Sequence, residues 1–157
     1  MRLPHVLIRR NLQALGIAAG VVALDLWTKR HASLTFRDDP VDVIPGFLDF
    51  TFVENSGGAF GMFPGGGQLI GVAAVIVTLV VLWALTTPRA GLEIISLGLV
   101  LGGAIGNLVD RFARGEGLID GAVIDWINLW VIPTFNLADA SVTIAVGLLL
   151  IHAWRAK

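Results

Sequence analysis

Two aspartates in apolar surroundings are the residues of this 157-residue chain best suited to chemistry. Asp125 lies within AVIDW at 122–126, and Asp139 ends FNLAD at 135–139. Pro133 interrupts the 13 residues between them, so the chain can turn back and bring both carboxylates together. Two carboxylates a few ångström apart do not both ionise easily, so one serves as an acid and the other as a base. This pairing suits the activation of water, although two unrelated interfacial acids would show the same spacing.

Other hydrolytic chemistries lack their residues. The chain has no cysteine, which excludes a thiol nucleophile, a disulfide framework and a zinc ribbon. Ser56, Ser96 and Ser141 have no histidine close in sequence, and His31 is best interpreted as a solvated residue at a helix end. We therefore expect neither a metal nor an organic cofactor.

Composition excludes further classes. Lys and Arg number 11 against 12 Asp and Glu, so the net charge of −1 offers no basic surface for nucleic acid. Hydrophobic residues make up 55% and charged residues 15% of the chain, whereas soluble domains carry about 25% charge. With a mean hydropathy of +0.80, the composition favours a membrane protein.

Four charge-poor runs approach the length of about 20 apolar residues that a membrane-spanning helix needs. They cover about 11–28, 68–87, 92–110 and 137–154, and the second and third lack the polar stripe of a soluble bundle. We expect an all-α polytopic membrane protein with one domain over 1–157. A cleaved signal peptide is the alternative for the first run, with Arg9 and Arg10 as its basic flank.

The density of basic residues favours a cytoplasmic N-terminus and C-terminus. The short inner segments hold Arg2, Arg9, Arg10, Arg89, Arg155 and Lys157, and the longer outer segments hold Lys29, Arg30, Arg37, Arg111 and Arg114. The tryptophans fit two interfacial belts, with Trp27, Trp126 and Trp130 outside and Trp83 and Trp154 inside. All acids except Glu93 fall on the outer side or at the outer ends of the spans. We therefore expect the chemistry near the outer face.

Two outer segments remain, at about 29–67 and 111–136. In the first, Leu48, Phe50 and Phe52 alternate with less apolar neighbours, which is the periodicity of a strand. Turn signals at 45–46 and 64–67 flank this stretch. The pattern predicts a small sheet on the outer membrane surface.

Polar residues recur where the spans meet the outer side. Asp25 and Lys29 are four residues apart on one helical face, the order that favours an ion pair. Asn107, Asp110 and Arg111 follow the third span, where polar groups are costly and usually paired. A helix-end ion pair without a role in the site is the alternative interpretation of the first two.

Glycines mark two further features. Gly98, Gly102 and Gly106 recur every four residues and Gly103 widens their face, a pattern that allows close helix packing. Asn55 opens NSGGAFG at 55–61, where a simple turn is the alternative to a site whose Asn binds an extended peptide backbone.

Taken in order, five segments resemble the lipoprotein signal peptidases (signal peptidase II), a bacterial family of aspartic intramembrane peptidases. The segments are DLWTK at 25–29, NSGGAFG at 55–61, GGAIGNLVDR at 102–111, AVID at 122–125 and FNLAD at 135–139. The resemblance implies removal of the signal peptide from a lipidated prolipoprotein, with cleavage before the diacylglyceryl-cysteine. It also implies the bacterial inner membrane, contact with membrane lipids and inhibition by globomycin. Nothing in the sequence demands more than a monomer.

The resemblance also implies roles for individual residues. Asp125 and Asp139 match the catalytic dyad. The residues that match substrate-binding or site-supporting positions are Asp25, Lys29, Asn55, Gly103, Asn107, Asp110, Arg111 and Asn136. Gly58 stands where many members have alanine, and the segment before Asp125 is longer than usual and contains Asp120. We prefer Asp125 to Asp120 for the dyad because its flanks are apolar on both sides.

A small transporter or channel subunit is the competing hypothesis, since intramembrane acids also mark ion pathways. That hypothesis predicts acids spread through the depth of the membrane, whereas here they gather toward one side. A purely structural scaffold would leave two acids in apolar segments unexplained.

Overall fold

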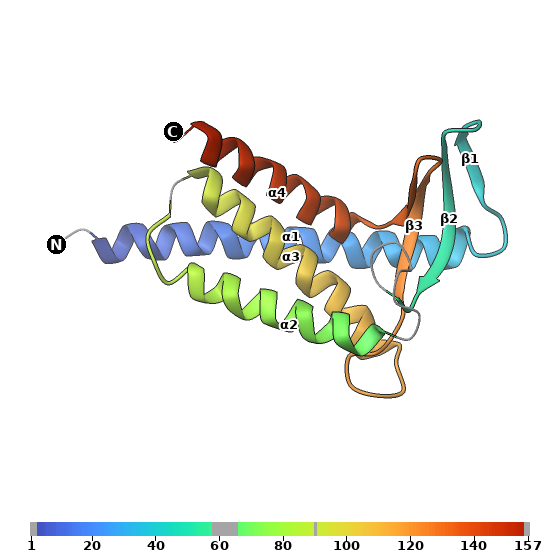
Figure 1. Ribbon diagram of the computed structural model, residues 1–157, viewed down its shortest axis with the longest axis horizontal. Coiled ribbons are helices and arrows are strands. Elements are labelled where there is room, and N and C mark those ends of the chain that lie inside the picture. The colour runs from blue at the N-terminus through green and yellow to red at the C-terminus, as the bar shows by residue number, and fades with distance from the viewer. Residues whose placement is uncertain (1–2, 58–65, 90, 156–157) are drawn as a thin grey trace.

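The part of the chain that the structure describes forms four helices and four short strands (Figure 1). The computed structural model describes residues 3–57, 66–89 and 91–155, with side chains described from residue 11 onward. The helices are α1 (Leu3–Thr35), α2 (Gly67–Ala84), α3 (Gly91–Ala113) and α4 (Leu137–Arg155). The strands are β1 (Val41–Ile44), β2 (Leu48–Asn55), β3 (Val123–Leu129) and β4 (Ile132–Phe135). The sheet lies at one end of the helix bundle, and α4 ends at the other (Figure 1).

Each helix contains a stretch long and apolar enough to cross a membrane, which confirms the four predicted spans. The stretches are Asn11–Thr35, Gly67–Ala84, Gly91–Ala113 and Leu137–Arg155, and their mean hydropathies run from 1.2 to 2.3. The basic residues Arg2, Arg9, Arg10 and Lys157, used above to predict orientation, lie outside the described side chains.

Several predicted boundaries are wrong. Residues 29–35 were expected in an outer loop but continue α1, and 111–113 continue α3. Each extension begins with a charged residue that ends an apolar run in the sequence, Lys29 in α1 and Arg111 in α3. Both residues are buried with polar partners. Because those partners compensate the charge, the helix does not need to end there. In contrast, α2 ends at Ala84, short of the predicted residue 87, where the Thr86 and Thr87 hydroxyls donate to the carbonyls of Trp83 and Ala84.

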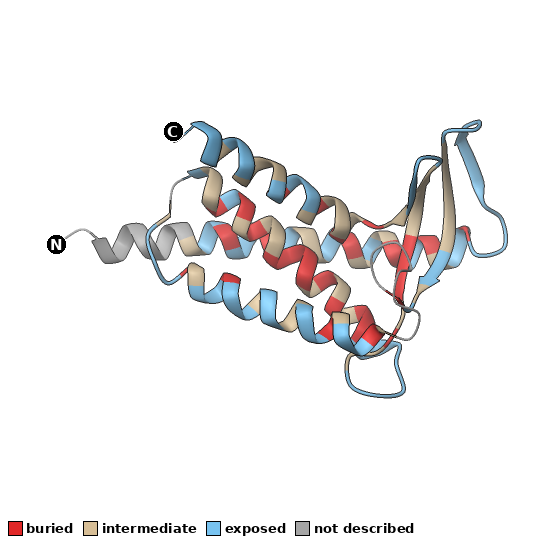
Figure 2. Cartoon of the chain, in the orientation of Figure 1, coloured by how far each residue is buried: buried red, intermediate tan, exposed pale blue. Residues whose placement is uncertain are grey.

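The glycine face of α3 lets it sit at the centre of the bundle. A Cβ at Gly102 would lie 2.6 Å from the Cβ of Val21 on α1, and one at Gly103 would lie 2.6 Å from the carbonyl oxygen of Ala138 on α4. Figure 2 shows buried residues concentrated along α3, whereas α2 and α4 present exposed outer faces. The predicted close packing through glycine is therefore confirmed, with α1 and α4 as the neighbours.

The sheet is antiparallel with the order β1-β2-β3-β4. The strand predicted around residues 48–53 is present as β2, and its central partner β3 pairs Asp125 with Val53. The residue pattern did not predict β3 and β4, because VIDWINL at 123–129 is apolar at adjacent as well as alternate positions. Its first three residues are buried, as expected of a strand covered on both faces.

Aromatic rings in tilted and edge-to-face contact join the end of α1 to the sheet. The ring centroid of Phe36 lies 5.6 Å from that of Phe50 on β2, and the Phe50 centroid lies 5.2 Å from that of Trp126 on β3. His31 is exposed, as predicted, but it also packs edge-on against Phe36 at 5.6 Å. These contacts fix the sheet over the end of the bundle that holds the polar residues.

The glycine face generates a prediction about stability. Gly102→Ala would force its new methyl group against Val21 and should destabilise the fold by about 1–3 kcal/mol, the usual cost of overpacking. Gly147→Ala on α4 is the matched control, because nothing lies within 4 Å of a Cβ there. Thermal unfolding in detergent should show a lower melting temperature for the first variant alone. Equal melting temperatures would contradict close packing at Gly102.

Candidate active site

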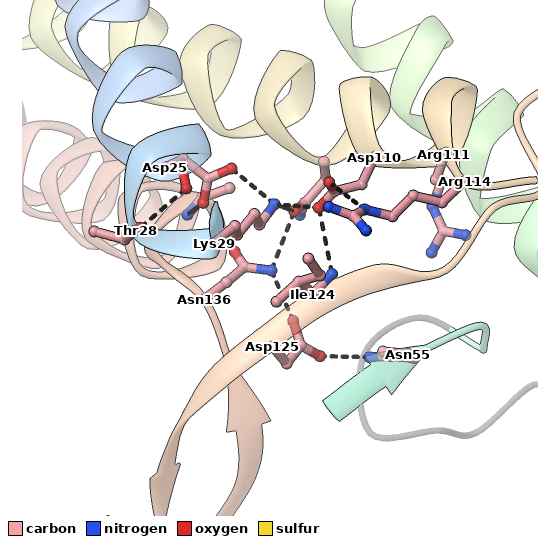
Figure 3. A network of polar contacts seen from close by, with 12 residues as sticks. Asp25, Thr28, Lys29, Asn55, Asp110, Arg111, Arg114, Ile124, Asp125 and Asn136 are labelled. Carbon is pink, nitrogen blue, oxygen red and sulfur yellow. Dashed lines mark hydrogen bonds and ion pairs between the residues drawn. The ribbon is translucent and has the colours of Figure 1, made fainter. Parts of the chain in front are cut away.

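Asp125 is buried at the start of β3, with only 2% of its surface exposed. Its two carboxylate oxygens accept hydrogen bonds from the side-chain amides of Asn55 at 2.8 Å and Asn136 at 2.7 Å (Figure 3). Asn55 is oriented by the turn that follows β2, because its side-chain oxygen Oδ1 accepts a hydrogen bond from the backbone amide of Gly57 at 3.0 Å. The simple-turn interpretation of this motif is therefore compatible with a polar role in the site.

The environment of Asp125 favours its protonated form. Burial raises the pKa of the Asp125 carboxyl to about 6, hydrogen bonds from Asn55 and Asn136 partly oppose that shift, and the charge of Asp139 adds to it. A carboxyl with such a pKa holds a proton at mildly acidic pH and can donate it.

Asp139 lies in the first turn of α4, where it forms a reciprocal cap with Asn136. The Asp139 backbone amide donates to the Asn136 side-chain oxygen at 2.9 Å, and the Asn136 backbone amide donates to the Asp139 carboxylate at 3.2 Å. This is a capping-box arrangement, with Asp in the third helical position. The other Asp139 oxygen accepts from the side-chain amide of Asn107 at 2.9 Å.

Asn136 brings the two predicted catalytic aspartates into one site. Its side-chain amide donates to Asp125 at 2.7 Å and to the Asn107 oxygen at 3.2 Å, while its backbone and side chain cap the turn that holds Asp139. Asn136 has no exposed surface. Its four contacts fix the orientation of both carboxylates.

Lys29 occupies the centre of a second, fully buried polar cluster. Its ammonium lies 2.7 Å from Asp25, 3.0 Å from Asp110 and 2.9 Å from the Asn107 side-chain oxygen (Figure 3). An ammonium has three donors, so each is matched to one acceptor. The ion pair between Asp25 and Lys29 predicted from their spacing is present, and Asp110 joins it from α3.

The two carboxylates of this cluster also hold the backbone next to the dyad. Asp25 accepts from the amide of Ala138 at 2.9 Å, and Asp110 accepts from the amide of Ile124 at 3.3 Å. Ala138 immediately precedes Asp139, and Ile124 immediately precedes Asp125. These backbone contacts were not predicted, since the residue types at 124 and 138 carry no signal for them.

Arg111 and Gly103 lie beside the site and play different parts. Arg111 is buried and donates through Nη1 to the carbonyls of Gly67 at 3.2 Å and Gly121 at 3.1 Å. It therefore ties the start of α2 to the segment before β3. Gly103 provides the close contact with Ala138 on α4, which is the packing role that the sequence left open.

Asp120 lies in the loop after α3, and its carboxylate accepts from the Gly117 amide at 3.1 Å. Those contacts match the interpretation of Asp120 as a turn residue. Residues 58–61 of the NSGGAFG motif, including Gly58, lie outside the described residues. Among the side chains that are described, no group of three or more His, Cys, Asp and Glu is arranged to hold a metal ion.

Known proteins match the chain over most of its length. The family model for signal peptidase (SPase) II matches residues 17–155. A lipoprotein signal peptidase from Chlorobium phaeovibrioides is 40% identical over 148 residues, covering 86% of this chain and 86% of the relative. One from Caldicellulosiruptor bescii is 38% identical over 133 residues, covering 85% of each chain.

Solved structures share the fold. A bacterial membrane enzyme determined by the in meso method at 2.3 Å superposes with a TM-score of 0.80 and 29% identity, covering 90% of this chain and 87% of that one. A second such enzyme, determined at 1.9 Å, gives a TM-score of 0.77 and 28% identity, covering 92% and 94%. The four apolar helices and these matches indicate a multi-pass membrane protein, and the chain belongs to the signal peptidase II family.

Proposed function

We propose that this chain is an aspartic endopeptidase that cuts the signal peptide from lipid-modified prolipoproteins, before the diacylglyceryl-cysteine, with Asp125 and Asp139 as its catalytic dyad. Signal-peptide processing follows from the family, whose members carry the name lipoprotein signal peptidase. The observation that supports the dyad is the position of Asn136, which hydrogen-bonds Asp125 and caps the turn of Asp139.

The two environments suggest an acid and a base. We assign the role of acid to Asp125, because burial raises the pKa of its carboxyl to about 6. We assign the role of base to Asp139. Asp139 takes a proton from water as the water oxygen attacks the scissile carbonyl carbon. Asp125 gives its proton to the carbonyl oxygen, which forms a gem-diol. Asp139 then gives its proton to the leaving nitrogen while Asp125 takes a proton back from a gem-diol hydroxyl, so the C–N bond breaks and a carboxylic acid and an amine are released.

The bundle suggests how a membrane-bound substrate meets this site. Trp27 and Trp130, 64% and 74% exposed, lie on elements near the sheet, whereas Trp83 and Trp154, 72% and 78% exposed, end α2 and α4 at the opposite end. Exposed tryptophans at both ends are typical of two membrane interfaces. We place the sheet at the outer face of the bacterial inner membrane and both termini in the cytoplasm, so the dyad meets the substrate at headgroup depth.

We assign the remaining polar residues to support of the dyad and of the substrate. Lys29, Asp25 and Asp110 are positioning residues, because they act through the amides of Ile124 and Ala138. Asn55 and Asn107 hold the Asp125 and Asp139 carboxylates. Globomycin-type inhibitors would compete for this site, which works in a monomer without a metal or organic cofactor.

The dyad is tested by isosteric substitution. Asp125→Asn and Asp139→Asn should each abolish cleavage, because an amide can neither take a proton from water nor donate one as an acid does. Asp120→Asn is the matched control and should keep most activity, since its carboxylate bonds within its own loop. The measurement is release of the signal peptide from a lipidated prolipoprotein, followed on a gel with and without globomycin.

Normal processing by either dyad variant would rule out the dyad. A loss of activity in Asp120→Asn equal to that in Asp125→Asn would reverse the assignment between those two acids. Thermal unfolding of each variant checks that the fold is retained.

The pKa of Asp125 predicts a pH profile. If Asp125 is the acid, kcat/KM falls as the pH rises through about 6, because the carboxyl then loses the proton it must donate. Asn55→Leu keeps a side chain branched at Cγ but removes a hydrogen bond that stabilises the ionised form of Asp125, so the fall should move to higher pH. Ser56→Ala, at an exposed neighbour, should leave the profile unchanged. A shift to lower pH in Asn55→Leu would contradict this assignment.

The positioning cluster predicts a large loss of stability. Lys29→Met leaves two buried carboxylates without their cation and should cost about 3–5 kcal/mol, the usual effect of breaking a buried pair. Arg37→Met removes the surface pair with Glu54, both half-exposed at 3.5 Å, and should cost about 0–1 kcal/mol. Melting temperatures in detergent compare the two, and an equally small change in both would argue against the cluster as a structural support.

A further inference from the structure

The loop between α3 and β3, residues 114–121, is closed at its neck and bonded to itself. At the neck, the Gly121 amide donates to the Arg111 carbonyl at 3.1 Å, and Arg111 Nη1 donates to the Gly121 carbonyl at 3.1 Å. Inside the loop, Asp120 accepts from the Gly117 amide. These residues therefore form a folded unit with a defined shape.

This loop docks on the first turn of α2 through two glycines. Gly67 and Gly71 are both buried and lie one turn apart on α2. A Cβ at Gly71 would collide with the carbonyl oxygen of Ile119, and one at Gly67 would collide with that of Asp120. The backbone of the loop therefore lies directly against a helix that contains no charged residue.

Ile119 adopts a conformation that its side chain disfavours. Its φ is 56°, in the left-handed region where β-branched residues are rare and strained. Ile119 is the residue that meets Gly71, so the strain is retained where the loop turns against α2. The residue before this reversal is Leu118.

The side chain of Leu118 is 73% exposed. The loop projects to the side of the bundle at the level where α2 begins and α3 ends (Figure 1). Leu69 and Val72, which lie close to Gly71 in the sequence of α2, are 67% and 43% exposed. An exposed leucine side chain beside an apolar helix would lower its free energy by moving from water into an apolar environment.

We propose that loop 114–121 is an interfacial anchor that lays Leu118 into the boundary between headgroups and acyl chains beside α2. Lipid fits this surface better than a protein partner does. The exposed apolar surface of the loop is the single side chain of Leu118, between Glu116 and Asp120, beside the uncharged helix α2. One side chain is far smaller than a stable protein interface. The inference requires only that the helices span a bilayer, and it is independent of the catalytic roles proposed above.

Anchoring this loop would set the height of the site in the membrane. The loop leads directly into β3, which carries Asp125, and its neck residue Arg111 also holds the start of α2 through the Gly67 carbonyl. A loop fixed at the interface therefore fixes the depth of the strand that follows it.

The absence of cysteine makes the test direct, because a single introduced cysteine carries a single nitroxide label. Leu118→Cys, Glu116→Cys and Leu69→Cys are labelled separately and reconstituted into phosphatidylcholine vesicles. Glu116 is the matched control in the same loop, and Leu69 is the reference on the apolar face of α2; all three positions are exposed. Collision rates with oxygen, which concentrates in acyl chains, and with a water-soluble nickel chelate report the depth of each label.

We expect the label at 118 to collide with nickel several-fold less than the label at 116, and with oxygen about as often as the label at 69. Equal nickel access at 118 and 116 would place position 118 in water and overturn the anchor. Protection of position 118 from both reagents would indicate a protein contact and would also overturn it. Unchanged melting temperatures and prolipoprotein cleavage confirm that each labelled protein is folded.

Discussion

One buried ammonium group, that of Lys29, sets the geometry on which the rest of the site depends. With 1% of its surface exposed, it must be fully paired, because an unpaired buried charge costs several kcal/mol (about 3–5). Asp25 on the same helix and Asp110 on α3 both supply carboxylates at 2.7 and 3.0 Å. The same carboxylates accept the amides of Ala138 and Ile124, so neutralising the lysine also places the backbone beside each proposed catalytic acid.

Sharing one cation between two helices requires that their axes come close, and the glycines of α3 permit it. A Cβ at Gly106 would lie 2.7 Å from the Asp25 carboxylate, and Gly102 admits Val21 of α1 in the same way. Small residues in membrane helices usually serve backbone packing alone. Here the glycine face and the ion cluster form one constraint, since a larger residue at 106 would push Asp25 away from Lys29.

The sequence predicted much of this arrangement, but only where the signal is local. Four apolar runs and the alternation around Phe50 predicted the helices and β2, and the spacing of Asp25 and Lys29 predicted their ion pair. The link from Lys29 to Asp110 joins residues far apart in the chain, so no spacing rule could reveal it. The same limit explains why the predicted first span ended too early, because the partner that lets α1 continue through a buried charge lies on α3.

The proposed roles of the two acids follow from the elements that carry them. Asp139 belongs to the first turn of α4, where Asn136 holds it by a reciprocal cap. Asp125 belongs to a buried strand, and burial raises its pKa, which suits a carboxyl that donates a proton. Because Asn136 also donates to Asp125, one buried amide ties the strand that carries the proposed acid to the helix start that carries the proposed base.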